Sequence, residues 1–206
     1  MIAVGCDPGH DNGAVAVVDT DARRVLACWA WTTPAHTTKA NPDRTATLQR
    51  WTGSAVTSEP IVHGPGMLWV VSREVVAYLH SIGRLPGVLA VEGIIPHHRG
   101  PVTASIAAGE AAGAACQALG AALGMGVPLE RPKASVWRAL VGVTTTDARR
   151  AAMDARALVG DETSSARWPT RLHGLPAELA RIDHAADACL IGEAGALVVG
   201  RARGVA

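Results

Sequence analysis

The sequence has few lysines, few cysteines and almost no net charge, which limits the classes of protein it can belong to. Charged residues make up 18% of the 206 and hydrophobic residues 49%, so the chain is globular rather than disordered. A formal net charge of +1 gives no global argument for a nucleic-acid partner, so any DNA-binding site must be a local patch. The four cysteines have no zinc-like spacing, and a chain of this length needs no disulfide staples. We therefore expect a reduced, intracellular protein.

Targeting and membrane segments are also missing from the pattern. No basic segment leads into an apolar run at the start of the sequence, so we expect no signal peptide. The long Ala/Gly-rich stretch at 103–127 contains Glu110 and Gln117, and we therefore expect a packed helix there and no membrane span. The length predicts one domain over residues 1–206. The cysteine usage and the expected lack of a signal peptide together predict a cytoplasmic location.

Hydrophobic patterning predicts an α/β fold. Three apolar runs separated by turn residues predict an antiparallel meander of strands at 2–6, 14–18 and 25–31. Residues 32–66 are rich in Thr, Pro, Gly, Ser and His without a period, which predicts a long loop insertion. Beyond the insertion, the pattern alternates helices with two further strands, giving a five-stranded mixed sheet flanked by helices. The expected helices are 68–82, 101–123, 135–141, 147–158 and 176–199, and the expected strands are 88–91 and 127–129.

Two of the expected strands each run into a carboxylate. Asp7 follows residues 2–6, and Glu92 follows residues 88–91. If the strands are neighbours, both acids lie at the carboxyl edge of the sheet, where ligands bind in open α/β folds. Like charges held together raise a pKa or attract a cation, and hard oxygen ligands select Mg²⁺ or Mn²⁺. Each acid alone also fits a plainer role, Asp7 as a turn residue before Pro8 and Glu92 as a surface acid at a strand end.

A second pair of acids lies on the expected terminal helix. Asp183 and Asp187 are separated by four residues and therefore share one helix face, with His184 about a third of a turn away. Like charges at this spacing destabilise a helix slightly unless a cation binds them. The alternative is an acidic face exposed to solvent.

These features resemble the RuvC-type Holliday-junction resolvases, in family order over about residues 1–31 and 88–199. The matching segments are Ala3-Val4-Gly5-Cys6-Asp7-Pro8-Gly9, Leu89-Ala90-Val91-Glu92, Ala108-Gly109-Glu110-Ala111-Ala112-Gly113, Pro132-Lys133 with Val136-Trp137-Arg138, and Asp183-His184-Ala185-Ala186-Asp187-Ala188. The Pro…Trp segment is similar to that of phage and prophage members. The resemblance implies the RNase H-like fold and a location in a bacterial or phage-infected cell.

The resemblance also implies a catalytic site. Asp7, Glu92 and Asp187 would be ligands of two Mg²⁺ ions, with Mn²⁺ able to substitute. Two alignments give the fourth position to Asp183 or to His184, and Asp183 is slightly favoured because carboxylate suits Mg²⁺ better than imidazole does. Basic residues complete the set, although each also fits a solvated surface cation. They are Lys133 and Arg138 near the scissile phosphate, and Arg149, Arg150 and Arg156 as a phosphate track.

The implied activity is two-metal-ion cleavage of branched DNA at four-way junctions by a homodimer, because a two-fold junction needs two related sites. One departure bears on substrate choice. Family members usually place an aromatic residue shortly after the second acid, whereas this chain has Gly93-Ile94-Ile95-Pro96-His97-His98 and no Phe at all. Two alternatives therefore stay open. The first is a nuclease of the same fold acting on flaps, forks or RNA–DNA hybrids, and the second is an actin-like nucleotide-binding protein without nuclease activity.

Overall fold

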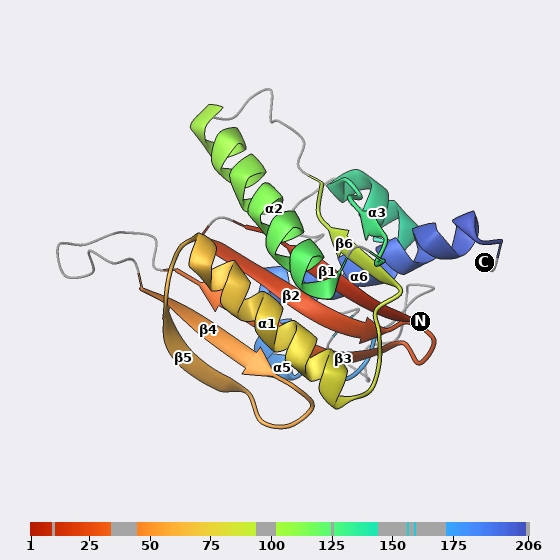
Figure 1. The fold of residues 1–206 in the computed structure, drawn as a ribbon, viewed down its shortest axis with the longest axis horizontal. Coiled ribbons are helices and arrows are strands. Elements are labelled where there is room, and N and C mark those ends of the chain that lie inside the picture. The colour runs from red at the N-terminus through yellow and green to blue at the C-terminus, as the bar shows by residue number, and fades with distance from the viewer. Residues whose placement is uncertain are drawn as a thin grey trace.

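A mixed seven-stranded sheet runs through the described part of the chain. The computed structural model describes residues 1–9, 11–33, 45–93, 102–124, 126–143, 156, 159 and 172–204. The strand order is β5-β4-β3-β2-β1-β6-β7, antiparallel from β5 to β1 and parallel from β1 to β7 (Figure 1). The strands are β1 (Ile2–Asp7), β2 (Asn12–Asp19), β3 (Arg24–Thr32), β4 (Thr45–Trp51), β5 (Thr57–Val62), β6 (Val88–Val91) and β7 (Leu129–Glu130).

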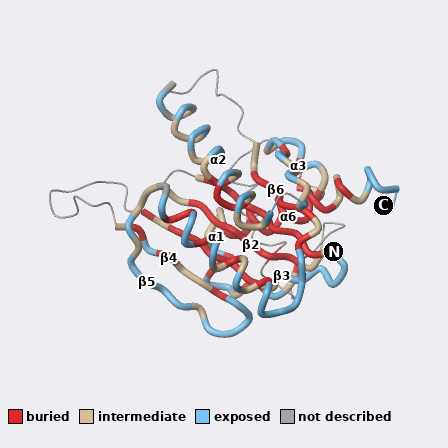
Figure 2. Tube along the Cα trace, in the orientation of Figure 1, coloured by how far each residue is buried: buried red, intermediate tan, exposed pale blue. Residues whose placement is uncertain are grey.

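Helices cover both faces of this sheet. Figure 1 shows α1 (Pro65–Ser81) and α2 (Val102–Leu123) in front of the strands and α6 (Asp183–Ala202) behind them. Two shorter helices, α3 (Ala134–Leu140) and α5 (Ala177–Ala180), pack against α6. The central strands and α6 form the buried interior in Figure 2. This α/β architecture, with its antiparallel start and parallel additions, confirms the predicted fold class.

The two faces of the sheet carry side chains of different size. Alternation along β2 sends Val15 and Val17 toward α1 and α2, and sends Ala14 and Ala16 toward α6. On β3, Trp29 and Trp31 also belong to the core under α1 and α2. The face under α6 is therefore shallow, and the helix backbone can lie close to the strands.

Glycines bring α6 into near-contact with β1. A Cβ added to Gly5 would lie 2.0 Å from the carbonyl oxygen of Ala188 and 2.4 Å from the backbone nitrogen of Gly192. One turn further along, a Cβ on Gly195 would lie 2.5 Å from the Cβ of Ala90 on β6. No side chain larger than hydrogen fits at these positions, so the glycines set how closely the helix approaches the two strands.

Two predictions about the fold were wrong. Residues 45–62 form the hairpin of β4 and β5, not a loop, and the sheet therefore has seven strands where five were expected. The polar residues that suggested a loop lie on the exposed side of an edge hairpin, while Ala46 and Leu48 fill the core. An ion pair between Arg50 Nε and Glu74 Oε2 (2.6 Å) ties the hairpin to α1.

The second error concerns the terminal helix, which is broken rather than continuous. Helix α5 ends at Ala180, and α6 begins at Asp183 after an extended Ile182 (φ −89°, ψ 112°). Because of this break, Asp183 and His184 lie in the first turn of α6. The expected helix at 147–158 falls almost wholly outside the described residues.

Within α2, the segment Ser105–Leu123 is long and apolar enough to cross a membrane by length and composition alone. Ala112, Ala115, Ala118 and Leu119 on this helix are nevertheless buried in the protein. The contacts of these four residues with the core fit the expectation of a packed helix.

Gly5→Ala tests the close approach of α6. The added methyl group would meet backbone atoms, which cannot rotate away, so we expect a loss of about 3 kcal/mol or more in the free energy of unfolding. Gly109→Ala is the matched control, because a Cβ at this exposed position of α2 meets nothing within 4 Å. The control should gain roughly 0.5–1 kcal/mol from helix propensity. Equal urea midpoints for the two variants would contradict the packing argument.

A buried carboxyl on α6 should make the stability depend on pH. Burial raises the pKa of Glu193 to about 7, against a weaker opposing effect of Arg23. The folded state therefore holds a proton that the unfolded chain releases near pH 4.5, and the stability falls as the pH rises from about 4.5 to 7. We expect Glu193→Gln to exceed the wild type by roughly 2–3 kcal/mol more at pH 8 than at pH 4 in urea unfolding. A difference independent of pH would show that this carboxyl is ionised without cost.

Candidate metal centre

The acids predicted at strand ends lie side by side. Strands β1 and β6 are parallel neighbours, with Cys6 paired to Val91. The backbone N–H of Glu92 donates to the carbonyl oxygen of Cys6 (3.0 Å), which places Glu92 next to Asp7. Asp7 is buried and Glu92 is half-buried. The two carboxyls therefore share the carboxyl edge of the sheet, as the strand pattern predicted.

Helix α6 brings its first turn to the same edge. The Nδ1 atom of His184 lies 2.5 Å from Oδ2 of Asp7, a hydrogen bond between the helix and β1. Three residues later, Asp187 is close enough for the charges of Asp7 and Glu92 to raise its pKa. The Gly5–Gly192 approach holds this turn against the strand end, so the site depends directly on the packing of α6.

Asp183 lies at the margin of this cluster. Its side chain is 47% exposed and forms an ion pair with Arg156. The negative charge of Asp183 raises the pKa of His184. The pKa values of Glu92 and Asp187 respond instead to Asp7, His184 and Arg138. Of the two candidates for the fourth position, the contacts favour His184 over Asp183.

Two residues of α3 complete the polar shell. The indole Nε1–H of Trp137 donates to Oε1 of Glu92 (2.9 Å), and the Trp137 side chain is fully buried. The guanidinium of Arg138 lies 5.0 Å from the centre of the Trp137 ring and 4.0 Å from Oδ2 of Asp187. Trp137 was named from the sequence only as part of a motif. Its hydrogen bond to Glu92 was not predicted, because nothing in the sequence around a core tryptophan indicates a polar contact.

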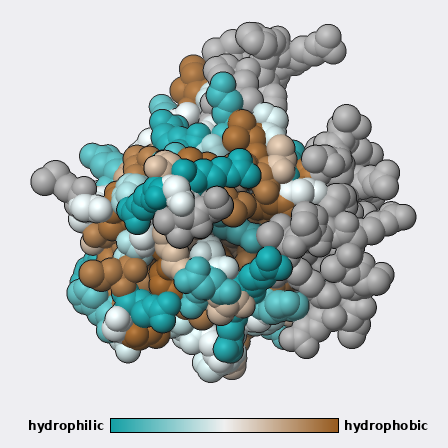
Figure 3. All heavy atoms as spheres, turned by 90° about the vertical axis from the view of Figure 1, so that its right-hand side faces the viewer, coloured by the Kyte–Doolittle hydropathy of each residue, from teal (hydrophilic) through white to brown (hydrophobic). Residues whose placement is uncertain are grey.

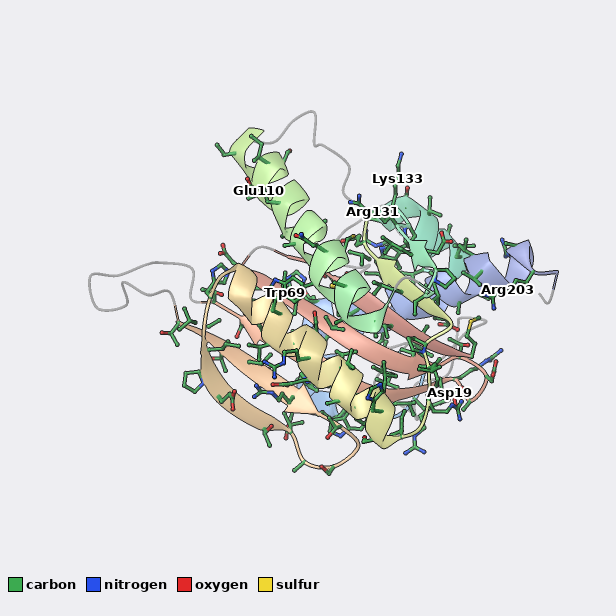
Figure 4. All side chains as sticks on the ribbon, in the orientation of Figure 1. Asp19, Trp69, Glu110, Arg131, Lys133 and Arg203 are labelled. Carbon is green, nitrogen blue, oxygen red and sulfur yellow. The ribbon has the colours of Figure 1, made fainter. Side chains whose placement is uncertain are left out.

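The other predicted basic residues are less closely involved. Lys133 is bridged through its backbone to Gly93, next to Glu92, but its exposed side chain projects outward from the start of α3 beside Arg131 (Figure 4). Arg156 pairs with Asp183. Arg149 and Arg150 lie outside the described residues, as do His97 and His98.

The cluster carries more negative charge than its neighbours balance. Burial, and then the charge of Asp7, raise the pKa of Glu92, while Trp137, Arg138 and His184 oppose the rise. Burial and Asp7 also raise the pKa of Asp187, to about 7. The hydrogen bond to Asp7 raises the pKa of His184 and favours its cationic form. In this arrangement the imidazolium and Arg138 serve as the counter-charges.

The donor set suits a divalent cation by its chemistry, but the arrangement is not closed around one. Three carboxyl groups lie at this edge, and burial and then the charge of Asp7 raise the pKa values of two of them, Glu92 and Asp187, as expected where a hard cation binds. Across the described part of the chain, however, no three His, Cys, Asp or Glu side chains are arranged to hold a metal ion. The hydrogen bond from His184 occupies Oδ2 of Asp7, an oxygen that a metal ion would otherwise be able to use.

Comparison with known proteins identifies the fold. No protein-family model and no curated protein matches this chain. A solved structure of RuvC from Thermus thermophilus is similar to it, with a TM-score of 0.50 and 16% sequence identity, over 98% of this chain and 97% of that one. The likeness confirms the RNase H-like fold of RuvC over nearly the whole chain. Any activity must be argued from the side chains.

Trp137→Phe tests the electrostatics of the site. Removal of the indole N–H takes away a donor that favours the charged form of Glu92, so the pKa of Glu92 should rise further, by roughly one pH unit. The measurement is a ¹³C NMR titration of the carboxyl groups without added metal. Trp69→Phe is the control, because Trp69 is 44% exposed on α1 and should leave the titration unchanged (Figure 4). An unchanged Glu92 in both variants would show that the hydrogen bond to Trp137 has no electrostatic effect.

Proposed function

We propose that this protein is a divalent-metal-dependent endonuclease that cleaves DNA at four-way junctions. The observation that carries the proposal is the convergence of Asp7, Glu92 and Asp187, from β1, from the end of β6 and from the first turn of α6, at one edge of a RuvC-type sheet. The solved relative is a RuvC, and the fold likeness over 98% of the chain supports a nuclease of this class.

Asp7, Glu92 and Asp187 are the proposed ligands of Mg²⁺, with Mn²⁺ as a substitute. Two bound ions would supply an activated water and stabilise the leaving oxygen of the phosphodiester. The contribution of the protein is to place three carboxyls at one half-buried edge of the sheet, where a bound ion would draw them together. Trp137 orients Glu92 through its hydrogen bond, and Arg138 faces Asp187. Both contacts keep the acids directed toward the shared edge of the sheet.

His184 is the proposed fourth member of the site, in place of Asp183. Because His184 is hydrogen-bonded to Asp7, its proton and a metal ion would compete for the same carboxylate. The raised pKa of His184 means that this competition is strongest at low pH. Asp183, exposed and paired with Arg156, is better suited to supporting the entrance of the site.

The proposed partner is branched DNA, bound by a homodimer in the cytoplasm of a bacterial or phage-infected cell. Lys133 and Arg138 stand on the α3 side of the acids, and Arg138 is close enough to neutralise charge near a bound phosphate. Arg149 and Arg150 remain proposed phosphate contacts. Paired cuts across a two-fold junction require two copies of this site.

Junction cleavage tests the function and the ligand assignment. Synthetic four-way junction, flap, fork, RNA–DNA hybrid and linear duplex are incubated with the protein in Mg²⁺, in Mn²⁺ and in EDTA. We expect paired nicks confined to the junction and abolished by EDTA. Asp7→Asn should lower the rate by at least about a thousandfold while junction binding persists, since it removes a ligand and no basic residue.

Asp21→Asn is the control for this experiment, because Asp21 is exposed at the opposite end of β1 from Asp7. Metal-dependent cutting of flaps, forks or hybrids instead of junctions would keep the site and change the substrate. Cutting that survives in Asp7→Asn would overturn the site. ATP binding without nuclease activity would favour an actin-like protein.

Separate variants distinguish the two candidates for the fourth position. His184→Ala should reduce kcat/KM for junction cleavage by roughly 10–100-fold, because it removes a direct partner of Asp7. Asp183→Ala should change it less than about threefold, as expected when an exposed ion pair is lost. The reverse order of effects would restore Asp183 to the site.

A further inference from the structure

A cavity lies away from the acid cluster, at the start of β1 and beside the C-terminal half of α6. Its volume is about 690 Å³, within the usual range for small-molecule sites. It is lined by Ile2 at the start of β1, by the turn after β2, by the segment between α1 and β6, and by the last turns of α6. Because Asp7 ends β1 and Asp183 begins α6, roughly 15 Å of strand and helix separate this cavity from the acid cluster.

One wall of the cavity contains an unpartnered carboxylate. Glu193 is 4% exposed, and its Oε2 atom is buried without a hydrogen-bond partner. Buried carboxylate oxygens are costly when unpaired, and burial raises the pKa of this group to about 7. A ligand that presents an N–H donor would satisfy this oxygen.

Three arginines belong to the same cavity as Glu193. Arg23, Arg84 and Arg203 all line the cavity. Arg84 is ion-paired with Asp19 (3.2 Å), while Arg23 and Arg203 form no ion pair with the described residues. Asp21 also lines the cavity and is paired with the amino group of Met1. The arginine fork is suited to phosphate oxygens, so this rim favours an anion.

Apolar side chains supply the remaining wall. Ile2, Leu85, Ala196 and Leu197 line the same cavity. Figure 3 views this end of the molecule and shows hydrophobic and hydrophilic groups side by side on it. Figure 4 places Arg203 and Asp19 on the same side, near the two termini. A ligand that fits all three features has a flat apolar body, N–H donors on one edge and an anionic group at the other end.

We propose that this cavity binds a guanine mononucleotide, with the base N–H groups at Glu193 and the phosphate at Arg23 and Arg203. The guanine edge carries two adjacent donors, N1–H and the 2-amino group, and a carboxylate accepts hydrogen bonds from both. Adenine and cytosine present a ring-nitrogen acceptor at the equivalent place, which repels a carboxylate oxygen. The geometry therefore favours guanine over these two bases. The site is independent of the proposed nuclease activity.

Calorimetric titration of the full chain with GMP, AMP and inorganic phosphate tests the proposal. We expect GMP to bind at least tenfold more tightly than AMP, and phosphate to bind weakest. Glu193→Gln should weaken GMP binding by roughly tenfold or more, because an amide replaces the charged acceptor of both guanine donors. AMP should bind the variant at least as tightly as the wild type, since the substitution removes the repulsion between the carboxylate and the adenine ring nitrogen. Its fold is checked by urea unfolding, where this variant should be at least as stable as the wild type.

Arginine variants on one helix supply a matched pair. Arg203→Ala should weaken both GMP and phosphate, whereas Arg201→Ala, on the same last turn but outside the cavity lining, should weaken neither. A single-stranded oligonucleotide with a terminal 5′-phosphorylated dG distinguishes a nucleic-acid end from a free nucleotide as the source. If the oligonucleotide binds through Glu193 and Arg203 like GMP, the ligand is a strand end. Absence of GMP binding, equal affinity for AMP, or binding unaffected by Glu193→Gln would each overturn the proposal.

Discussion

The close approach between α6 and β1 is the constraint on which the rest of the structure depends. Gly5 leaves no room for a Cβ and Gly192 leaves little, so the helix backbone lies almost directly on the strand. This distance decides whether the first turn of α6 reaches the carboxyl end of β1, where His184 contacts Asp7. Small residues on this face of the sheet are therefore part of the site, although none of them touches a reacting atom. The larger side chains of the central strands lie on the opposite face, under α1 and α2, which allows the α6 face of the sheet to remain shallow.

Repulsion among the acids is tolerated because each has a specific partner. Trp137 donates to Glu92, His184 bonds to Asp7, and Arg138 lies near Asp187. These partners reduce the charge without removing it, since the pKa values of Glu92 and Asp187 both remain raised. Such a centre costs stability by itself and gains it when a cation binds, which is the usual relation between a preorganised polar site and its ligand. Under the proposed function, the histidine proton and a cation would be alternatives at the carboxylate of Asp7.

Local pattern predicted the central part of the fold and its acids, and tertiary contacts decided the rest. Apolar runs that end in Asp7 and Glu92 identify two strands and the edge where they meet, because strand period and turn residues are local signals. The β4–β5 hairpin was not predicted, because its outer face is polar and its inner face has only Ala46 and Leu48 as clear core residues. The helix break at Ile182 was not predicted, because apolar residues continue through it in the sequence. The choice of Asp183 or His184 for the fourth position of the site depends on how α6 lies against β1. The spacing of residues along the helix does not predict this.

Helix α6 carries two shielded carboxyls, Asp187 in its second turn and Glu193 near its middle, and their surroundings differ. Asp187 has Arg138 and His184 nearby, whereas Oε2 of Glu193 has no hydrogen-bond partner. Both groups have a pKa near 7, so each destabilises the ionised folded state at neutral pH. An apolar residue of similar volume would avoid this cost if the helix were only a packing element. A buried acid that reaches a cavity recovers the cost only when something in the cavity pairs with it. This cost is the reason for proposing a ligand at each carboxyl, a cation beside Asp187 and an N–H donor beside Glu193.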